Sequence, residues 1–256
     1  MTRERRRGPF THHNSLITTH GSEPPCDAHD GAGPTSPLYP PSSLMVTIID
    51  YGIGNLRSIE KAFERVGAEV VRTDDPQAVR DAERLVLPGV GAFGACIDEI
   101  RRRDLEGPIH DAIEAGTPFL GVCVGMQLLF DVGLEKGRHR GLGVLPGRVV
   151  HFHEAETADD LVVPHMGWNA IEPTRAHPFL NGVDEPAYVY FVHSFHAVAD
   201  EEAHVLATTE YGHDFPSVVQ HENVLGVQFH PEKSQSSGLR MLENFATLPR
   251  PERASA

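Results

Sequence analysis

Cys123 lies between two glycines in the segment GVCVG, where a short apolar run changes to a helix-like pattern. This is the cysteine counterpart of the G-x-S-x-G turn, which carries an exposed nucleophile between a strand and a helix. Such a turn needs glycines because side chains two positions before and after the nucleophile would clash. Amide groups at the start of the following helix would favour a thiolate and a nearby oxyanion. The alternative is a buried structural cysteine, and the pentapeptide alone does not exclude it.

The segment GVQFHPEKS contains a candidate base for this cysteine. His230 follows an apolar run that is typical of a buried strand, and the carboxyl end of a strand faces the usual crevice of a parallel sheet. His230 could activate Cys123, and Glu232 could accept the other imidazole N–H and fix the tautomer. A surface His-Pro-Glu turn is the alternative. The order Cys, His, Glu favours a triad for acyl transfer.

The glycine-rich segment LPGVGAFG could supply an oxyanion hole. It ends a strand-like run, and Gly89 and Gly91, on either side of Val90, would let backbone N–H groups approach a ligand closely. The same glycines would also suit an ordinary strand-to-helix turn or a phosphate cradle. The segment does not match the P-loop pattern, so a nucleotide site of that kind is not expected.

Alternating runs predict the elements that position these residues. Apolar runs that are typical of buried strands occur at residues 45–51, 68–73, 84–89 and 118–123. Segments read as helical occur at residues 55–67, 95–103, 108–116 and 125–131. This alternation predicts an α/β fold of the flavodoxin-like kind, with a mostly parallel central sheet and helices on both faces.

The later half of the chain changes character. Strand-like runs with few helices between them occur at residues 147–153, 168–173, 187–194, 204–211, 216–222 and 224–230. A last segment, residues 236–248, is read as a helix. The pattern predicts an antiparallel extension of the central sheet before a closing helix.

The composition limits the classes of function. The chain has 256 residues and a formal net charge of −14, which argues against nonspecific binding to nucleic acid or to anionic membranes. No apolar run approaches the length of a membrane span. The cysteines, at positions 26, 96 and 123, form no disulfide framework and no metal-ligand spacing. The sequence therefore predicts a cytoplasmic protein without a metal or an organic cofactor, and its few lysines would suit a high-salt cytoplasm.

Residues 1–44 differ from the rest of the chain. They are rich in proline, glycine and serine, and they show little periodicity. Such a composition cannot bury a core. Because Met45 stands directly before the first strand-like run, we expect residues 1–44 to be a disordered N-terminal extension or a mis-assigned start. We expect a single domain over residues 45–256.

Two segments, GVCVGMQLLF and FHPEKS, resemble the signatures of class I (triad) glutamine amidotransferases. Four more, IIDYGIGNLRSI, LPGVGAF, PHMGWN and YFVHSFH, resemble one subfamily, the glutaminase subunits of imidazole glycerol phosphate synthase in histidine biosynthesis. The resemblance runs in order from Met45 to about Leu248. Val124 stands where leucine is usual in the family, and Phe195 stands where tyrosine is usual.

The resemblance implies a glutaminase that releases ammonia from glutamine through a thioester on Cys123. It implies that His230 protonates the departing ammonia, that Glu232 orients His230, and that the Gly89–Gly91 segment forms the oxyanion hole. It also implies which residues hold the α-amino and α-carboxylate groups of glutamine: Gln127, Glu135, His193, Ser194 and, through its backbone at most, Phe195. An ordinary polar residue on a helix is the alternative for Gln127.

The resemblance further implies a partner that uses the ammonia. In the subfamily this partner is a cyclase subunit with a (β/α)₈ barrel, which forms a heterodimer with the glutaminase and makes imidazole glycerol phosphate and aminoimidazole carboxamide ribotide. The interface residues implied here are Trp168, Asn169, Tyr190 and Lys233. A core tryptophan and a solvated lysine are the alternatives.

Three other functions compete with this one. The chain could be the glutaminase of another synthase, although PHMGWN and YGIGNLRS argue against it. It could be a free-standing hydrolase of γ-glutamyl compounds, or a catalytically silent interaction module. The set of Cys123, His230 and Glu232 argues against a silent module. Cys96, on a predicted helix, is expected to be replaceable.

Overall fold

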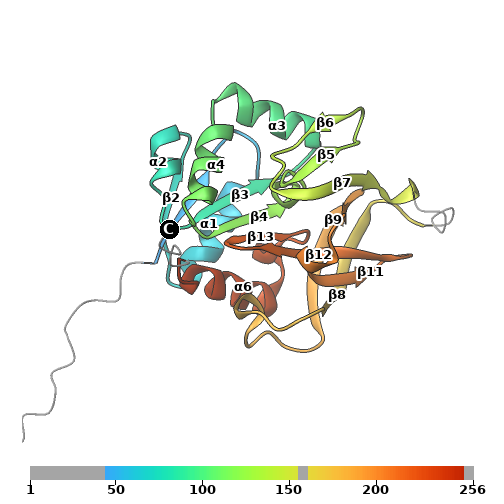
Figure 1. The fold of residues 1–256 in the computed structure, drawn as a ribbon. Coiled ribbons are helices and arrows are strands. Elements are labelled where there is room, and N and C mark those ends of the chain that lie inside the picture. The colour runs from blue at the N-terminus through green and yellow to red at the C-terminus, as the bar shows by residue number, and fades with distance from the viewer. Residues whose placement is uncertain (1–43, 155–160, 251–256) are drawn as a thin grey trace, which may run out of the picture. The chain divides into compact units, whose positions relative to one another are not determined.

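The computed structural model describes residues 44–154 and 161–250, and within them a nine-stranded sheet runs through the fold (Figure 1). The strands lie side by side in the order β2 (Glu69–Thr73), β1 (Met45–Ile49), β3 (Leu85–Gly89), β4 (Phe119–Cys123), β13 (Val224–Val227), β12 (Asp214–His221), β11 (Val205–Glu210), β8 (His165–Pro173) and β9 (Ala187–His193). Pairing is parallel from β2 to β13 and antiparallel from β13 to β9. The predicted parallel sheet with an antiparallel extension is therefore confirmed.

Helices cover both faces of the parallel strands. They are α1 (Leu56–Arg65), α2 (Pro76–Arg80), α3 (Phe93–Arg102), α4 (Glu106–Glu114) and α6 (Gln235–Thr247). Figure 1 shows α3 and α4 on one side of the sheet and α6 on the other. Phe63 of α1 packs against Phe245 of α6, with ring centroids 6.1 Å apart. Strands β3 and β4 are buried along their whole length because both of their faces are covered.

A second sheet of four strands lies within the described residues, in the order β10 (Phe195–Ala199), β7 (Leu145–His151), β5 (Phe130–Gly133) and β6 (His139–Arg140). Short 3₁₀ helices complete the fold: η1 (Phe152–Glu154), η2 (Pro178–Leu180), η3 (Glu202–His204) and η4 (Pro231–Lys233). The sequence did not predict β5, β6 or β10 as separate strands, and it missed α2.

The helix predicted over residues 125–131 is wrong beyond its first turn. Helix α5 (Val124–Gln127) is short, and the chain then enters β5. The carbonyl groups of Leu128 and Leu129 accept hydrogen bonds from Leu142 and Val144 in the returning chain, not from the next helical turn. Because this apolar run is buried throughout, its sequence cannot distinguish a helix from a strand.

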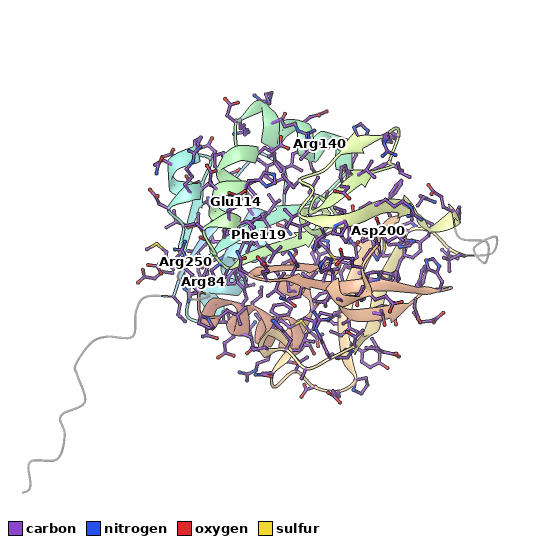
Figure 2. All side chains as sticks on the ribbon, in the orientation of Figure 1. Arg84, Glu114, Phe119, Arg140, Asp200 and Arg250 are labelled. Carbon is purple, nitrogen blue, oxygen red and sulfur yellow. The ribbon has the colours of Figure 1, made fainter. Side chains whose placement is uncertain are left out.

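Two arginines tie the end of the chain to the amino ends of the parallel strands (Figure 2). Arg84 donates to the carbonyl oxygen of Leu248 (3.2 Å), and Arg250 donates to that of Ala115 (2.7 Å). These contacts lie at the end of the sheet opposite to the carboxyl ends of its parallel strands. None of the helices in the described part of the chain is long and apolar enough to cross a membrane. Apart from Leu44, the extension predicted over residues 1–44 lies outside the described residues.

Buried histidines join the antiparallel strands to the second sheet. The ring of Phe152, which follows β7, lies within 4.7 to 6.2 Å of the rings of His165, His193 and His196. His193 Nδ1 donates to the carbonyl oxygen of Phe195 (2.8 Å), so its Nε2 accepts from His165 Nδ1 (3.1 Å). Burial lowers the pKa of His165 to about 4, of His193 to about 3 and of His196 to about 4.

We expect this histidine cluster to make the fold sensitive to acid. Unfolded histidines take up protons below about pH 6.5, whereas His165, His193 and His196 stay neutral in the fold until pH 4 or below. Stability should therefore be complete above pH 6.5 and fall as the pH drops toward 4, by roughly 1 to 2 kcal/mol for each histidine at pH 5. Chemical denaturation at pH 7.5 and pH 5 measures this loss.

A variant at an exposed histidine provides the control. His153→Gln should reproduce the acid loss of the wild type, because the His153 side chain is exposed and outside this buried set. Equal unfolding free energies at the two pH values would contradict the prediction.

Candidate active site

Cys123 stands on a strained turn at the end of β4. Its φ is +56° and its ψ −112°, a conformation that costs energy in a residue with a side chain. A Cβ atom on Gly121 would lie 2.6 Å from the carbonyl oxygen of Gly125, and one on Gly125 would overlap the carbonyl oxygen of Leu87. The two glycines are thus required by close backbone contacts, as the sequence predicts. The turn places the thiol at the carboxyl edge of the sheet.

Strand β13 brings His230 to the same edge. It pairs in parallel with β4, with Val227 opposite Val122, so the residues that follow both strands meet beyond their ends. His230 Nδ1 lies 2.9 Å from Glu232 Oε1, and only 3% of the Glu232 side chain is exposed. Ser234 Oγ donates to the carbonyl oxygen of His230 (2.7 Å), which fixes the backbone of this turn. The structure therefore brings the predicted cysteine, histidine and glutamate together.

The electrostatics of this group favour a protonated imidazole. Burial by itself lowers the pKa of His230, but its hydrogen bonds with Cys123 and Glu232 raise the pKa to about 10. Since Glu232 occupies Nδ1, the Nε2–H remains for Cys123. An imidazolium beside a cysteine favours the thiolate, which is the nucleophilic form. Such a pair can attack a carbonyl carbon and then protonate a leaving group.

The predicted oxyanion segment lies beside the thiol. Gly89, at the end of β3, is in register with Cys123 of β4. A Cβ atom on Gly89 would lie 2.8 Å from the backbone nitrogen of Gly125, so this position has no room for a side chain. Gly91 has a φ of +86°, which glycine adopts without strain. Val90 between them is 36% exposed.

A cavity of about 520 Å³ opens in front of Cys123. Several of its lining residues were predicted to touch the oxyanion or the substrate: Val90, Gly91, Gln127, Glu135, His193, Ser194 and Phe195. Lining residues that the sequence did not predict are Ala92, Val124, Lys136, Pro164 and Val192. Gly89 and Glu232 instead line a smaller cavity of about 10 Å³ on another side of His230.

Gln127 is fixed by hydrogen bonds at the base of the large cavity. Its Nε2 donates to the carbonyl oxygen of Phe195 (2.9 Å) and to Gln228 Oε1 (3.1 Å), which leaves its own Oε1 as an acceptor. Gln228 is completely buried, and its Nε2 lies 3.9 Å from the sulfur of Cys123. Gln228 was not among the residues predicted from the sequence, although a polar residue inside the apolar run GVQFH is a signal for it.

Two other predicted substrate residues have protein partners. Glu135 Oε2 accepts from the backbone N–H of Phe93 (2.8 Å), at the start of α3. Both ring nitrogens of His193 are engaged, one by Phe195 and one by His165. The His193 ring therefore has no nitrogen left for a substrate, although it lines the cavity.

Three of the predicted partner residues, Trp168, Tyr190 and Lys233, lie together on a separate face formed by β8, β9 and η4. Trp168 is opposite Tyr190 in this strand pair, and the Lys233 ammonium lies 5.7 Å from the centre of the Tyr190 ring. Trp168 is 46% exposed, which excludes a core role for it. Met166 and Tyr188, 61% and 53% exposed, extend this face, and neither was among the residues predicted from the sequence. The alternation of side chains along a strand is the signal for such a face, because Met166 and Trp168 are two residues apart and therefore point to the same side.

Asn169, the remaining predicted partner residue, is turned toward the protein. Its Nδ2 donates to the carbonyl oxygen of Glu210 (2.8 Å) and lies 3.5 Å from His165 Nε2. Asn169 therefore connects the exposed face of β8 to the buried histidines.

Comparison with known proteins identifies relatives over nearly the whole described chain. The family described as glutamine amidotransferase class-I matches residues 47–248. The chain is 72% identical over 212 residues to the imidazole glycerol phosphate synthase subunit HisH of Salinibacter ruber, which covers 82% of this chain and 97% of that protein. It is 50% identical over 206 residues to the HisH subunit of Syntrophotalea carbinolica, which covers 80% of this chain and 100% of that protein.

Solved structures share the fold. PurLQS from Thermotoga maritima superposes with a TM-score of 0.60 at 20% identity, covering 79% of this chain and 96% of that chain. A glutamine amidotransferase superposes with a TM-score of 0.58 at 21% identity, covering 79% of this chain and 99% of that chain. These likenesses support the α/β architecture with its mixed sheet.

Replacing Glu232 should change the pH dependence of the reaction. The Glu232→Gln variant loses the negative charge that helps to raise the pKa of His230 to about 10. Activity that needs the imidazolium is lost as the pH rises through this pKa. The alkaline limb of kcat/KM for glutamine hydrolysis should therefore move to lower pH in the variant. Steady-state rates measured across the alkaline range test this.

Glu64→Gln is the matched control, because Glu64 is exposed on α1 and lines neither of the two cavities beside the triad. It should leave the alkaline limb where the wild type has it. An unshifted limb in Glu232→Gln would show that Glu232 does not act through His230.

Proposed function

The chain belongs to the class I glutamine amidotransferase family, and from this premise we propose how its site works and which partner it serves. Within the family it belongs with the HisH subunits of imidazole glycerol phosphate synthase, in histidine biosynthesis. Its domain covers residues 45–256, and it acts in the cytoplasm as a glutaminase that passes ammonia to a cyclase subunit. The observation that carries this proposal is Cys123 on its strained turn, with His230 and Glu232 beside it.

The first half of the reaction forms a thioester. The thiolate of Cys123 attacks the side-chain carbonyl carbon of glutamine, and the carbonyl oxygen takes the negative charge. His230 gives its Nε2 proton to the amide nitrogen, the carbon–nitrogen bond breaks, and ammonia leaves. Glu232 holds Nδ1–H throughout, which keeps the imidazole in the required orientation.

The second half hydrolyses the thioester. Neutral His230 removes a proton from a water molecule, and the resulting hydroxide attacks the γ-glutamyl carbonyl. Collapse of the intermediate breaks the carbon–sulfur bond, releases glutamate and restores the thiolate of Cys123 beside protonated His230. No group besides the triad is needed to balance these proton transfers.

The Gly89–Val90 peptide acts as a gate for the oxyanion. In one orientation it would point a carbonyl into the site, and in the other an N–H. Only the N–H stabilises the oxyanion, and one such donor contributes about a hundred- to thousandfold in rate. A partner whose substrate-bound form favours the N–H orientation would activate the enzyme by about that factor.

The large cavity provides complementary groups for the amino-acid part of glutamine. The free Oε1 of Gln127 and the carboxylate of Glu135 suit the α-amino group. The ammonium of Lys136, at the same cavity, suits the α-carboxylate. The backbone at Ser194 and Phe195 completes the wall, so the missing tyrosine hydroxyl at position 195 does not remove a backbone contact.

Ammonia leaves toward the partner. The small cavity adjoins His230 and Glu232 and is also lined by Asn55. Its volume of about 10 Å³ is close to that needed for one small polar molecule. The partner is a cyclase subunit with a (β/α)₈ barrel, and the two form a heterodimer. The exposed side chains of Met166, Trp168 and Tyr188 suit such a contact because aromatic anchors dominate interfaces.

Glutamine turnover in three states tests this function. The isolated chain should be nearly idle, the complex with the cyclase should be faster, and the complex with the cyclase ligand bound should be fastest, by roughly a hundred- to thousandfold over the isolated chain. Cys123→Ala should abolish glutamine hydrolysis, whereas added ammonia should still support cyclisation. Equal rates in all three states would instead favour a free-standing hydrolase.

Trp168→Ala should weaken the complex. An exposed tryptophan at the centre of an interface contributes 2 kcal/mol or more, so the Kd for the cyclase should rise roughly thirtyfold or more. The matched control is Val71→Ala, since Val71 is 44% exposed on β2, at the opposite edge of the nine-stranded sheet. Titration calorimetry gives both Kd values, and an unchanged Kd for Trp168→Ala would place the interface elsewhere.

A further inference from the structure

Two buried side chains hold the oxyanion segment from behind. The hydroxyl of Tyr51 donates to the carbonyl oxygen of Pro88 at 2.8 Å. The thiol of Cys96 donates to the carbonyl oxygen of Val90 at 3.4 Å. The first acceptor belongs to the Pro88–Gly89 peptide and the second to the Val90–Gly91 peptide. The Gly89–Val90 peptide therefore lies between two peptides that are each fixed by a side chain.

Both donors are permanent. Tyr51 and Cys96 have no exposed surface. Burial raises the pKa of the Tyr51 hydroxyl far above its usual range and also raises the pKa of the Cys96 thiol. The two side chains also lie close together, since each affects the pKa of the other. They therefore remain protonated at every pH at which the protein works and form one unit of two donors.

The fold places this unit at the base of the segment. Tyr51 follows β1, which pairs in parallel with β3, and Cys96 lies in the first turn of α3, which begins just after the segment. A Cβ atom on Gly89 would lie 3.0 Å from the Tyr51 hydroxyl oxygen, so the hydroxyl packs directly against the mobile peptide's first residue. Glu135 fixes the start of α3 through the Phe93 N–H.

We propose that Tyr51 and Cys96 are positioning residues that confine the motion of the oxyanion segment to the single Gly89–Val90 peptide. A peptide is a rigid plane, and it can turn between fixed neighbours by opposite rotations about the bonds at its two ends. Gly89 permits this rotation because it has no side chain. Because the peptides on both sides are anchored, the Gly89–Val90 peptide switches between two orientations. The Val90 N–H then reaches the oxyanion without a whole loop having to become ordered.

This inference rests on the proposed function and gives Cys96 a role. A thiol that only filled the core could be replaced by alanine, as expected from the sequence. A thiol that anchors Val90 cannot be replaced in this way, although serine, which keeps a donor, can partly substitute for it. The hydroxyl of Tyr51 anchors Pro88 in the same way, and the substitution Tyr51→Phe removes this hydroxyl without changing the ring.

The test measures glutamine turnover in the full complex with the cyclase and its ligand. Tyr51→Phe and Cys96→Ala should each lower kcat roughly tenfold, with KM for glutamine within about twofold of wild type. Cys96→Ser should keep kcat within about threefold of wild type. Alkylation of Cys123 by iodoacetamide, followed by peptide mass spectrometry, should proceed at the wild-type rate in all variants, because that reaction develops no oxyanion.

Specific results would overturn the inference. Values of kcat within twofold of wild type in both Tyr51→Phe and Cys96→Ala would show that the two hydrogen bonds do not position the segment. A parallel loss of Cys123 alkylation would show a general disturbance of the site and would equally contradict it. A wild-type complex without glutamine turnover would refute the proposed function itself, which separates that failure from failure of the anchors.

Discussion

The site depends on one close backbone contact between the start of α5 and the neighbouring strand β3. Gly125, two residues after Cys123, packs against the carbonyl oxygen of Leu87 in β3 with no room for a side chain. Beside this contact, Cys123 ends β4 in its strained conformation. The parallel pairing of β3 with β4 sets Gly89 in register with Cys123, so the two residues meet at the same edge of the sheet. The well-packed strands on both sides supply the stability that keeps the strain in place.

The antiparallel half supplies a second, polar constraint. A chain of hydrogen bonds runs from Asn169 through His165 and His193 to the carbonyl oxygen of Phe195, which also accepts from Gln127. Each histidine must be neutral and in one tautomer for this chain to exist. Burial lowers the pKa of His165 and of His193, so the neutral forms persist at working pH. Phe195 takes part in this chain through its backbone carbonyl oxygen and not through its side chain.

The sequence predicted the parallel half well and the second sheet poorly, for physical reasons. Glycine spacing around Cys123 and the His-Pro-Glu run are local signals, because steric clash and strand ends act over a few residues. The helix predicted over residues 125–131 failed because a fully buried run carries no periodicity. Gln228 and the contact between Cys96 and Val90 depend on strands and helices meeting in space. No spacing along the chain can report such a contact.

His230 and the exposed face of β8 and β9 are parts of one hydrogen-bonded circuit. The backbone N–H of His230 donates to the carbonyl oxygen of Tyr190 (2.9 Å), and Tyr190 donates its own N–H to Ser234 Oγ (3.0 Å). Ser234 in turn donates to the carbonyl oxygen of His230 (2.7 Å), which closes the circuit. Lys233, within the same turn, lies over the Tyr190 ring. A partner that contacts Tyr190 or Lys233 would therefore touch the backbone that carries His230, whereas the Pro88–Val90 backbone is held by Tyr51 and Cys96.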